Sequence, residues 1–263
     1  MLTYESMVMA LSEREFYSAG KSTWGRELYY YKVGKGEKRL FINGVHHGNE
    51  YITGQIAMDF YHYVKERCNG WEIYVMPMVN PDSAVIAGGF IPQSTETFCR
   101  IKKQNGWKNP ISRWTKNAEG VDINHNYDAD FSGEFSEGRY PESEPETKGV
   151  ANLVREKNFN MVICLHSQGE VIYHGFKGVY PIGSIEIAEK MAEISGYKIE
   201  EPSGSAVSGG MKDWFCDKFS RPGFTIEVGR GKNPIDESQI KEIEERLFPA
   251  IYKGMLTYDE VLC

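Results

Sequence analysis

Three short stretches of the chain contain histidine and carboxylate side chains that could bind a metal ion. They are His47-Gly48-Asn49-Glu50 near the start, Leu165-His166-Ser167 in the middle and Phe224-Thr225-Ile226-Glu227 near the end. Two histidines and one carboxylate form a three-ligand set that zinc favours when a fourth position stays open for water. A second carboxylate, Glu227, is then available to take a proton from that water. The pattern predicts a metal-assisted hydrolase with one Zn²⁺ per chain.

The first stretch offers two possible histidine ligands. His47 and Glu50 are three residues apart and face one side of a tight turn, but His46 and Glu50 would also face together at i and i+4. A short H-x-x-E motif is common by chance, and a histidine that ends an apolar strand, such as His166, is often a hydrogen-bonded core residue. Glu227 is more informative, because a carboxylate in the apolar strand FTIEV is costly to bury without a partner.

The spacing of apolar residues predicts alternating strands and helices around these stretches. Compact apolar runs predict strands at Leu28–Val33, Arg39–Asn43, Trp71–Met76, Met161–Leu165 and Phe224–Val228. Apolar residues at helical spacing predict helices at Ile52–Lys65, Ile185–Ser195 and Ile235–Tyr258. This alternation favours an α/β fold with a buried sheet, in which ligands gather beyond the strand ends. All three stretches lie at or next to an expected strand end.

We expect residues 1–263 to form a single catalytic domain. The composition is 41% hydrophobic and 25% charged, as in ordinary globular proteins, and we see no repeat or linker. The net charge of −7, without a basic cluster, argues against nucleic acid and anionic membranes as partners. Five dispersed cysteines predict reduced thiols. Together with the lack of a signal-peptide pattern and of a membrane-spanning apolar run, they predict a cytoplasmic location.

The section from Ala84 to Pro145 differs from the rest of the chain. It is rich in Gly, Asn, Ser and charged residues and shows little periodicity. Loops of this length in a compact domain are usually functional or disordered. We therefore expect this section to form walls of the substrate site.

The chain resembles the zinc metallopeptidases of the carboxypeptidase A type. Matching segments occur in the family's order as GVHHGNE, VNPDS, GVDINHNYD, SEPET, ICLHSQGE, SGGMKDW and FTIEVG. The resemblance implies a single α/β domain with a mixed, twisted, mainly eight-stranded sheet flanked by helices. It implies zinc ligation by His47, Glu50 and His166. It also makes His46 a non-ligand and Glu227 the general base and acid.

Several positions depart from the carboxypeptidase pattern. The Asn-Arg pair that holds a terminal carboxylate in those enzymes falls on Asn124 and His125, and the family's mobile tyrosine falls on Ser205. Histidine does not replace the fixed bidentate fork of arginine. The arginine that stabilises the oxyanion should lie within SRWTKNAEG, where Arg113 and Lys116 are both candidates. A solvated loop cation is the alternative for each of them.

The nearest subgroup consists of bacterial enzymes that cleave the γ-D-glutamyl–diaminopimelate bond of peptidoglycan peptides. The similarity lies in ICLHSQGEVIY, YPESEPET and SGGMKDWF. A murein peptide carries several carboxylates, with which Lys212 or Arg230 could pair; ordinary surface cations are the alternative. Other interpretations are a carboxypeptidase with altered C-terminal preference, a zinc acyl-amino-acid amidohydrolase and an inactive peptide- or glycan-binding module. Intact ligand and base positions argue against the inactive module.

Overall fold

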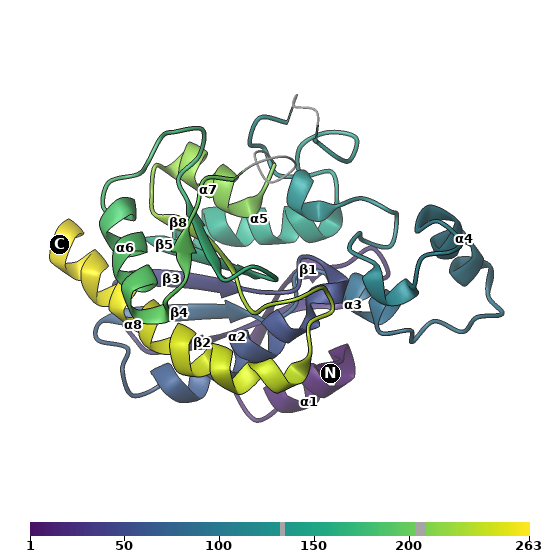
Figure 1. Ribbon diagram of the computed structural model, residues 1–263, viewed down its shortest axis with the longest axis horizontal. Coiled ribbons are helices and arrows are strands. Elements are labelled where there is room, and N and C mark those ends of the chain that lie inside the picture. The colour runs from purple at the N-terminus through teal and green to yellow at the C-terminus, as the bar shows by residue number, and fades with distance from the viewer. Residues whose placement is uncertain (132–134, 203–208) are drawn as a thin grey trace.

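The chain folds around a central eight-stranded sheet, and helices cover both faces of this sheet (Figure 1). The computed structural model describes residues 1–131, 135–202 and 209–263. The strands are β1 Phe16–Lys21, β2 Glu27–Val33, β3 Lys38–Asn43, β4 Trp71–Met76, β5 Met161–His166, β6 Val171–His174, β7 Lys198–Ile199 and β8 Gly223–Glu227. The helices are α1 Tyr4–Leu11, α2 Tyr51–Val64, α3 Pro81–Ala87, α4 Glu96–Gln104, α5 Pro145–Lys157, α6 Ser184–Ser195, α7 Met211–Phe219 and α8 Ile240–Leu262.

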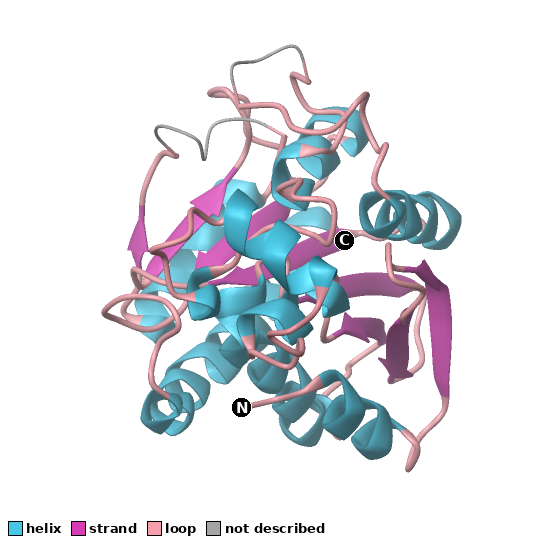
Figure 2. Cartoon of the chain, turned by 90° about the vertical axis from the view of Figure 1, so that its right-hand side faces the viewer, coloured by secondary structure: helices cyan, strands magenta, loops and turns pink. Residues whose placement is uncertain are grey.

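Strand order decides where the functional stretches meet. The order is β1-β2-β4-β3-β5-β8-β6-β7, and the four adjacent strands β4, β3, β5 and β8 run parallel. The pairs β1/β2, β2/β4 and β6/β8 are antiparallel, so the sheet is mixed, and its twist is visible in Figure 2. Parallel strands end at the same edge of a sheet. The chain segments that follow β3 and β5, and the last residue of β8, are therefore brought together at one edge.

Alternating side chains of the central strands fill two cores, one on each face of the sheet. Leu40 and Ile42 of β3 belong to the core that is shared with α1, α2, α6 and α8. Phe41, between them, belongs to the core that is shared with α5 and α7, where it stacks on Phe159 with 5.1 Å between ring centroids. All six residues of β5 are buried. The three-layer packing explains why these strands read as continuous apolar runs, because both of their faces are covered.

The predicted fold class is confirmed, and each predicted strand and helix has a counterpart in the structure. The five predicted strands correspond to β2, β3, β4, β5 and β8, and the three predicted helices correspond to α2, α6 and α8. The predicted C-terminal helix began too early, because the short 3₁₀ helix Glu237–Gln239 precedes α8 and Asp236 caps it. Strands β1, β6 and β7 were not predicted; β6 and β7 have four and two residues and offer no readable period.

The expectation of an aperiodic section between Ala84 and Pro145 was wrong in part. This section contains α4, whose first turn is capped by the Thr95 hydroxyl, which accepts a hydrogen bond from the Phe98 N–H at 3.1 Å. The helix is mostly polar and has Ile101 as its buried residue, so it offered too few apolar positions for a helix to be predicted. Among the described residues, no helix combines the length and apolar character that crossing a membrane requires.

Candidate metal centre and active site

Three predicted ligands converge at the edge where the parallel strands end. Glu50 closes the 3₁₀ helix η1 Gly48–Glu50, which follows β3, and His166 is the last residue of β5. The Nδ1 atom of His47 lies 2.9 Å from one Glu50 carboxylate oxygen, and Nδ1 of His166 lies 3.0 Å from the other. One potential ligand atom from each residue lies within 4.8 Å of the others. That spacing fits one ion with bonds of about 2.0–2.2 Å to each ligand.

The contacts behind the ligands orient them toward this point. The second ring nitrogen of His47, Nε2, lies 3.2 Å from a carboxylate oxygen of Asp122. Such a partner fixes the ring and directs Nδ1 toward the metal position, as carboxylate–histidine pairs do in metal sites. Glu50 also accepts weaker hydrogen bonds from the Ser167 N–H at 3.3 Å and the Asn233 amide at 3.4 Å. The donor set and its supports therefore fit a zinc ion.

Mutual charge pairing sets the protonation of the ligands. Burial by itself would lower the pKa of His47, but the carboxylates of Glu50 and Asp122 raise it well above the usual histidine value. Burial would raise the pKa of Glu50, but His47 and His166 lower it to about 2. Glu50 is therefore ionised at neutral pH. A buried carboxylate that is already ionised needs no proton loss before it binds a cation.

His46 is not part of the ligand group. Its ring stacks on that of His166, with 5.3 Å between centroids, and its Nε2 lies 3.2 Å from the Tyr127 hydroxyl. Burial lowers the pKa of His46 well below the usual value, so the ring is neutral. The structure thus places His46 behind the site as a packing residue and leaves His47 as the ligand.

Glu227 lies on the strand next to the ligands. It ends β8 and pairs in register with His166 on β5 and with Val171 on β6. Burial raises the pKa of Glu227 to about 7; His166 lowers it and Glu50 raises it. A carboxyl group with a pKa near neutrality is well matched to accept and return a proton during catalysis.

Similarity to known proteins agrees with this geometry. Residues 5–250 match the family described as zinc carboxypeptidase. The chain belongs to the zinc carboxypeptidase family. The predicted resemblance is thereby confirmed, and so is zinc as the cofactor of the ligand group His47, Glu50 and His166. The expected enzyme class, a zinc metallopeptidase, is that of the family.

Relatives of this zinc carboxypeptidase family member cover most of its length. The chain is 31% identical to gamma-D-glutamyl-L-diamino acid endopeptidase 1 of Lysinibacillus sphaericus, over 90% of this chain and 66% of the relative. It is 27% identical to human carboxypeptidase B, over 88% of this chain and 62% of that protein. The chain thus spans about two thirds of the length of these curated relatives.

Solved structures of the family share the fold. Carboxypeptidase A from Helicoverpa armigera has a TM-score of 0.78 at 18% identity, over 100% of this chain and 74% of that one. Murein-tripeptide amidase from Escherichia coli O157 has a TM-score of 0.61 at 19% identity, over 91% of each chain. At these identities the likeness shows the fold alone.

Asn124 and His125, which we expect at the family's carboxylate-binding positions, lie on the 3₁₀ helix η3 Ile123–His125. The Asn124 side-chain oxygen accepts a hydrogen bond from the Met211 N–H at 3.2 Å, at the start of α7. Its own N–H donates to Asp122, the carboxylate that also contacts His47. This side of the expected substrate site is therefore tied to the metal centre through Asp122.

The two candidate oxyanion cations lie in different surroundings. The Lys116 ammonium donates to both oxygens of Glu137 at 2.8 Å, and Glu137 accepts a further hydrogen bond from the Asp122 N–H. Arg113 is exposed and ends the 3₁₀ helix η2 Ile111–Arg113. The next residue, Trp114, accepts a hydrogen bond from the Asn49 N–H at 3.1 Å. The Lys116 side chain thus reaches the loop of Asp122 through Glu137, whereas the segment of Arg113 contacts the ligand-bearing turn through Trp114.

The remaining predicted substrate residues are Lys212, Arg230 and Ser205. Lys212 is buried in α7, where its ammonium donates to the Gly175 carbonyl at 2.8 Å and pairs with Asp213. Arg230 is 59% exposed and pairs with Glu242 at 2.7 Å, so the protein itself already supplies its carboxylate. Ser205 lies outside the described residues.

Sequence reasoning missed two residues of the site. Asp122 supports His47 from 75 residues away, and the available signal was an acidic residue directly before the Ile123-Asn124-His125 motif. Asn233 receives a hydrogen bond at 2.7 Å from the Ser167 hydroxyl and donates to Glu50. Nothing in the local sequence around Asn233 indicates that role.

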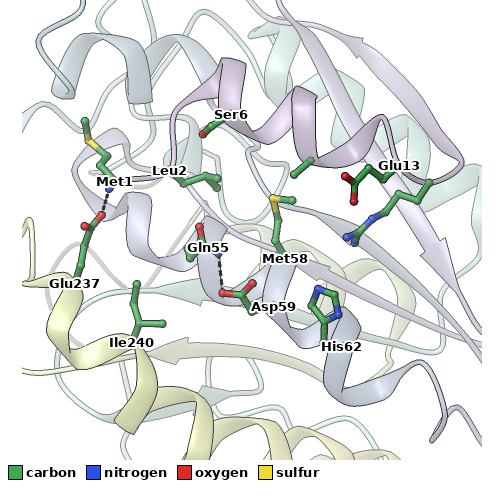
Figure 3. Close-up of a pocket in the computed structure, with 12 residues that line it drawn as sticks. Met1, Leu2, Ser6, Glu13, Gln55, Met58, Asp59, His62, Glu237 and Ile240 are labelled. Carbon is green, nitrogen blue, oxygen red and sulfur yellow. Dashed lines mark hydrogen bonds and ion pairs between the residues drawn. The ribbon is translucent and has the colours of Figure 1, made fainter.

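Cavity size does not locate this centre. A cavity of about 560 Å³ lies among α1, α2 and the start of α8, as Figure 3 shows. Met1 pairs there with Glu237, and the Gln55 amide donates to Asp59 at 2.7 Å. None of the ligands or candidate catalytic residues lines this cavity. The chemistry of the side chains, not the volume of the hollow, identifies the active site.

A graded series of variants tests the ligand assignment. We expect His47→Ala to lower zinc affinity more than about 100-fold, and Asp122→Asn to lower it by about 10- to 100-fold because only the orientation of His47 is lost. His46→Gln is the matched control and should bind zinc within a few-fold of the unchanged protein. Competition with a chromogenic chelator measures all three. If His46→Gln loses zinc and His47→Ala retains it, the ligand assignment is wrong.

Proposed function

We propose that this chain is a zinc peptidase that hydrolyses the γ-D-glutamyl–diamino acid bond of murein peptides. The observation that carries the proposal is a complete zinc ligand group with a carboxyl group of near-neutral pKa, Glu227, on the adjacent strand end. The names of two relatives, the endopeptidase of Lysinibacillus sphaericus and the murein-tripeptide amidase, support the substrate class.

The proposed chemistry divides between the metal and the side chains. Zinc, when bound, supplies a Lewis acid that polarises the scissile carbonyl group and makes water more acidic. Glu227 accepts the proton of the attacking water and passes it to the leaving amine, a transfer that suits its pKa. His47 stays oriented during this step because the Asp122 carboxylate holds its Nε2.

Arg113 is the stronger candidate for stabilising the oxyanion. Lys116 shares its charge with Glu137 at 2.8 Å, which leaves less positive field for a developing negative charge. Arg113 is exposed beside the segment that contacts the metal-bearing turn. Donors of this kind are typically worth roughly 100- to 1000-fold in rate. Both residues remain proposals for this role.

The substrate assignment rests on the carboxylate-binding positions. His125 stands where a carboxypeptidase uses arginine, so the bidentate grip on a terminal α-carboxylate is absent. We propose that Asn124 orients the peptide. Lys212 follows the Asn124-bonded Met211 in α7, but its ammonium already pairs with Asp213, so we rank it below Asn124 as a substrate residue. Ser205 belongs to the same set of proposed substrate residues.

A metallocarboxypeptidase with altered C-terminal preference is the second candidate, and the match to carboxypeptidase B favours it. The zinc acyl-amino-acid amidohydrolase and inactive-module interpretations have no specific observation in their favour. The five cysteines are free, in agreement with the predicted reduced thiols, and we propose a bacterial source.

The first test compares two substrates. We expect the zinc-loaded protein to cleave L-Ala-γ-D-Glu-meso-diaminopimelate between glutamate and diaminopimelate, and to cleave an ordinary C-terminal dipeptide at least about tenfold less efficiently, because the arginine fork is missing. Mass spectrometry of the products identifies the bond. Equal or better turnover of the dipeptide would instead establish the carboxypeptidase function.

The second test restores the missing fork. His125→Arg should raise kcat/KM for the C-terminal dipeptide by roughly 10- to 100-fold, as expected for a charged hydrogen-bonded contact to its carboxylate. The matched control is His62→Arg, which adds a cation at an exposed position of α2. Steady-state kinetics should show no gain for the control. A gain of similar size in both variants would mean that overall charge, rather than position 125, governs dipeptide binding.

A further inference from the structure

Positive charge is concentrated in one segment, which we call the basic arm and define as residues 97–116. Its cations are Arg100, Lys102, Lys103, Lys108, Arg113 and Lys116, and it contains no Asp or Glu, although Glu96 and Glu119 flank it. The remainder of the chain, with 24 cations and 37 carboxylates, has a net charge of −13. The expectation that charge is spread without a basic cluster was therefore wrong.

The basic arm is a folded projection. Helix α4 stands out from the body of the protein at the right of Figure 1. Its buried residue, Ile101, packs in a small separate core with Ile86 and Trp114. Arg100 pairs with Glu119 at 3.2 Å, and the Lys102 ammonium donates to the Asn109 carbonyl at 2.6 Å. These contacts give the segment a defined shape, so its exposed side chains are presented in fixed relative positions.

The tip of the basic arm exposes an aromatic ring beside cations. Trp107 is 61% exposed, and Lys103 and Lys108 are exposed as well. At that exposure most of the indole ring is in contact with water and is available to a partner. The flat face of an indole ring suits a sugar ring, and ammonium groups attract carboxylates.

The basic arm is continuous with the metal centre. At its base the Trp114 carbonyl accepts a hydrogen bond from Asn49, the neighbour of the ligand Glu50. The Thr115 carbonyl accepts a hydrogen bond at 3.1 Å from the Ser83 hydroxyl, which in turn accepts one from Gly48 at 2.9 Å. The base of the basic arm is therefore in hydrogen-bond contact with the turn that carries the ligands His47 and Glu50.

We propose that the basic arm binds polymeric peptidoglycan, with Lys103 and Lys108 pairing with carboxylates of the stem peptides and Trp107 stacking on a sugar ring. The choice of this polymer rests on the proposed function. Peptidoglycan combines sugar rings with carboxylate-bearing peptides, which matches both features of the tip. Nucleic acid fits less well, because two of the six cations already pair with Glu119 and Glu137 and too few remain for closely spaced phosphates.

The test measures sedimentation with insoluble, purified peptidoglycan in a Glu227→Gln background, which keeps the polymer intact. Lys103→Glu/Lys108→Glu should weaken binding at least about tenfold and flatten its salt dependence. Trp107→Ala should weaken binding without changing the salt dependence. The matched control, Lys35→Glu/Lys65→Glu, makes the same charge change at exposed positions outside the basic arm and should bind normally.

Two results would overturn the proposal. One is equal binding, or an equal loss of binding, in the arm variant and its control. The other is a larger loss for double-stranded DNA or anionic phospholipid vesicles than for peptidoglycan, which would assign the basic arm to a different partner. When Glu227 is left unchanged, the Lys103→Glu/Lys108→Glu variant should cleave the soluble tripeptide with a kcat/KM within twofold of that of the unchanged protein. If the unchanged protein does not cleave that tripeptide, the proposed function fails, whereas the binding comparison stands independently.

Discussion

The rest of the site depends on the contacts of the Glu50 carboxylate with His47 and His166. Its two oxygens lie 2.9 and 3.0 Å from the two histidine Nδ1 atoms. The histidines come from positions more than 100 residues apart, so only the parallel pairing of β3 with β5 brings them to one carboxylate. Burying these groups is tolerable because each charge has a partner. The same geometry that satisfies the carboxylate also defines the position of a cation.

Asp122 extends this centre toward the substrate side. It contacts His47, receives the Asn124 N–H, and is tied through its own N–H to Glu137 and so to Lys116. One carboxylate therefore joins the ligand His47 to Asn124, and Glu137 links the same residue to the loop cation Lys116. Asp122 is thus the residue through which these loops contact His47.

Much of this arrangement could be predicted from the sequence, and the limits have physical causes. Strands such as β5 were predictable because burial on both faces demands a continuous apolar run. The ligands were predictable only from the three stretches together with the family resemblance, because His46 and His47 both fitted the local motif. Asp122 could not be connected to His47, because their contact depends on tertiary packing across 75 residues. The burial of Lys212 was hidden for the same reason, since its partner Gly175 follows the short strand β6.

The measurement that tests the account most directly compares zinc content and turnover in Glu227→Gln. Our account predicts that this variant binds one zinc ion per chain with unchanged affinity but loses activity on the murein tripeptide by at least about 100-fold, because glutamine cannot accept the proton from water. Loss of zinc together with activity would make Glu227 a part of the ligand group. Retention of most activity would contradict its role as the base.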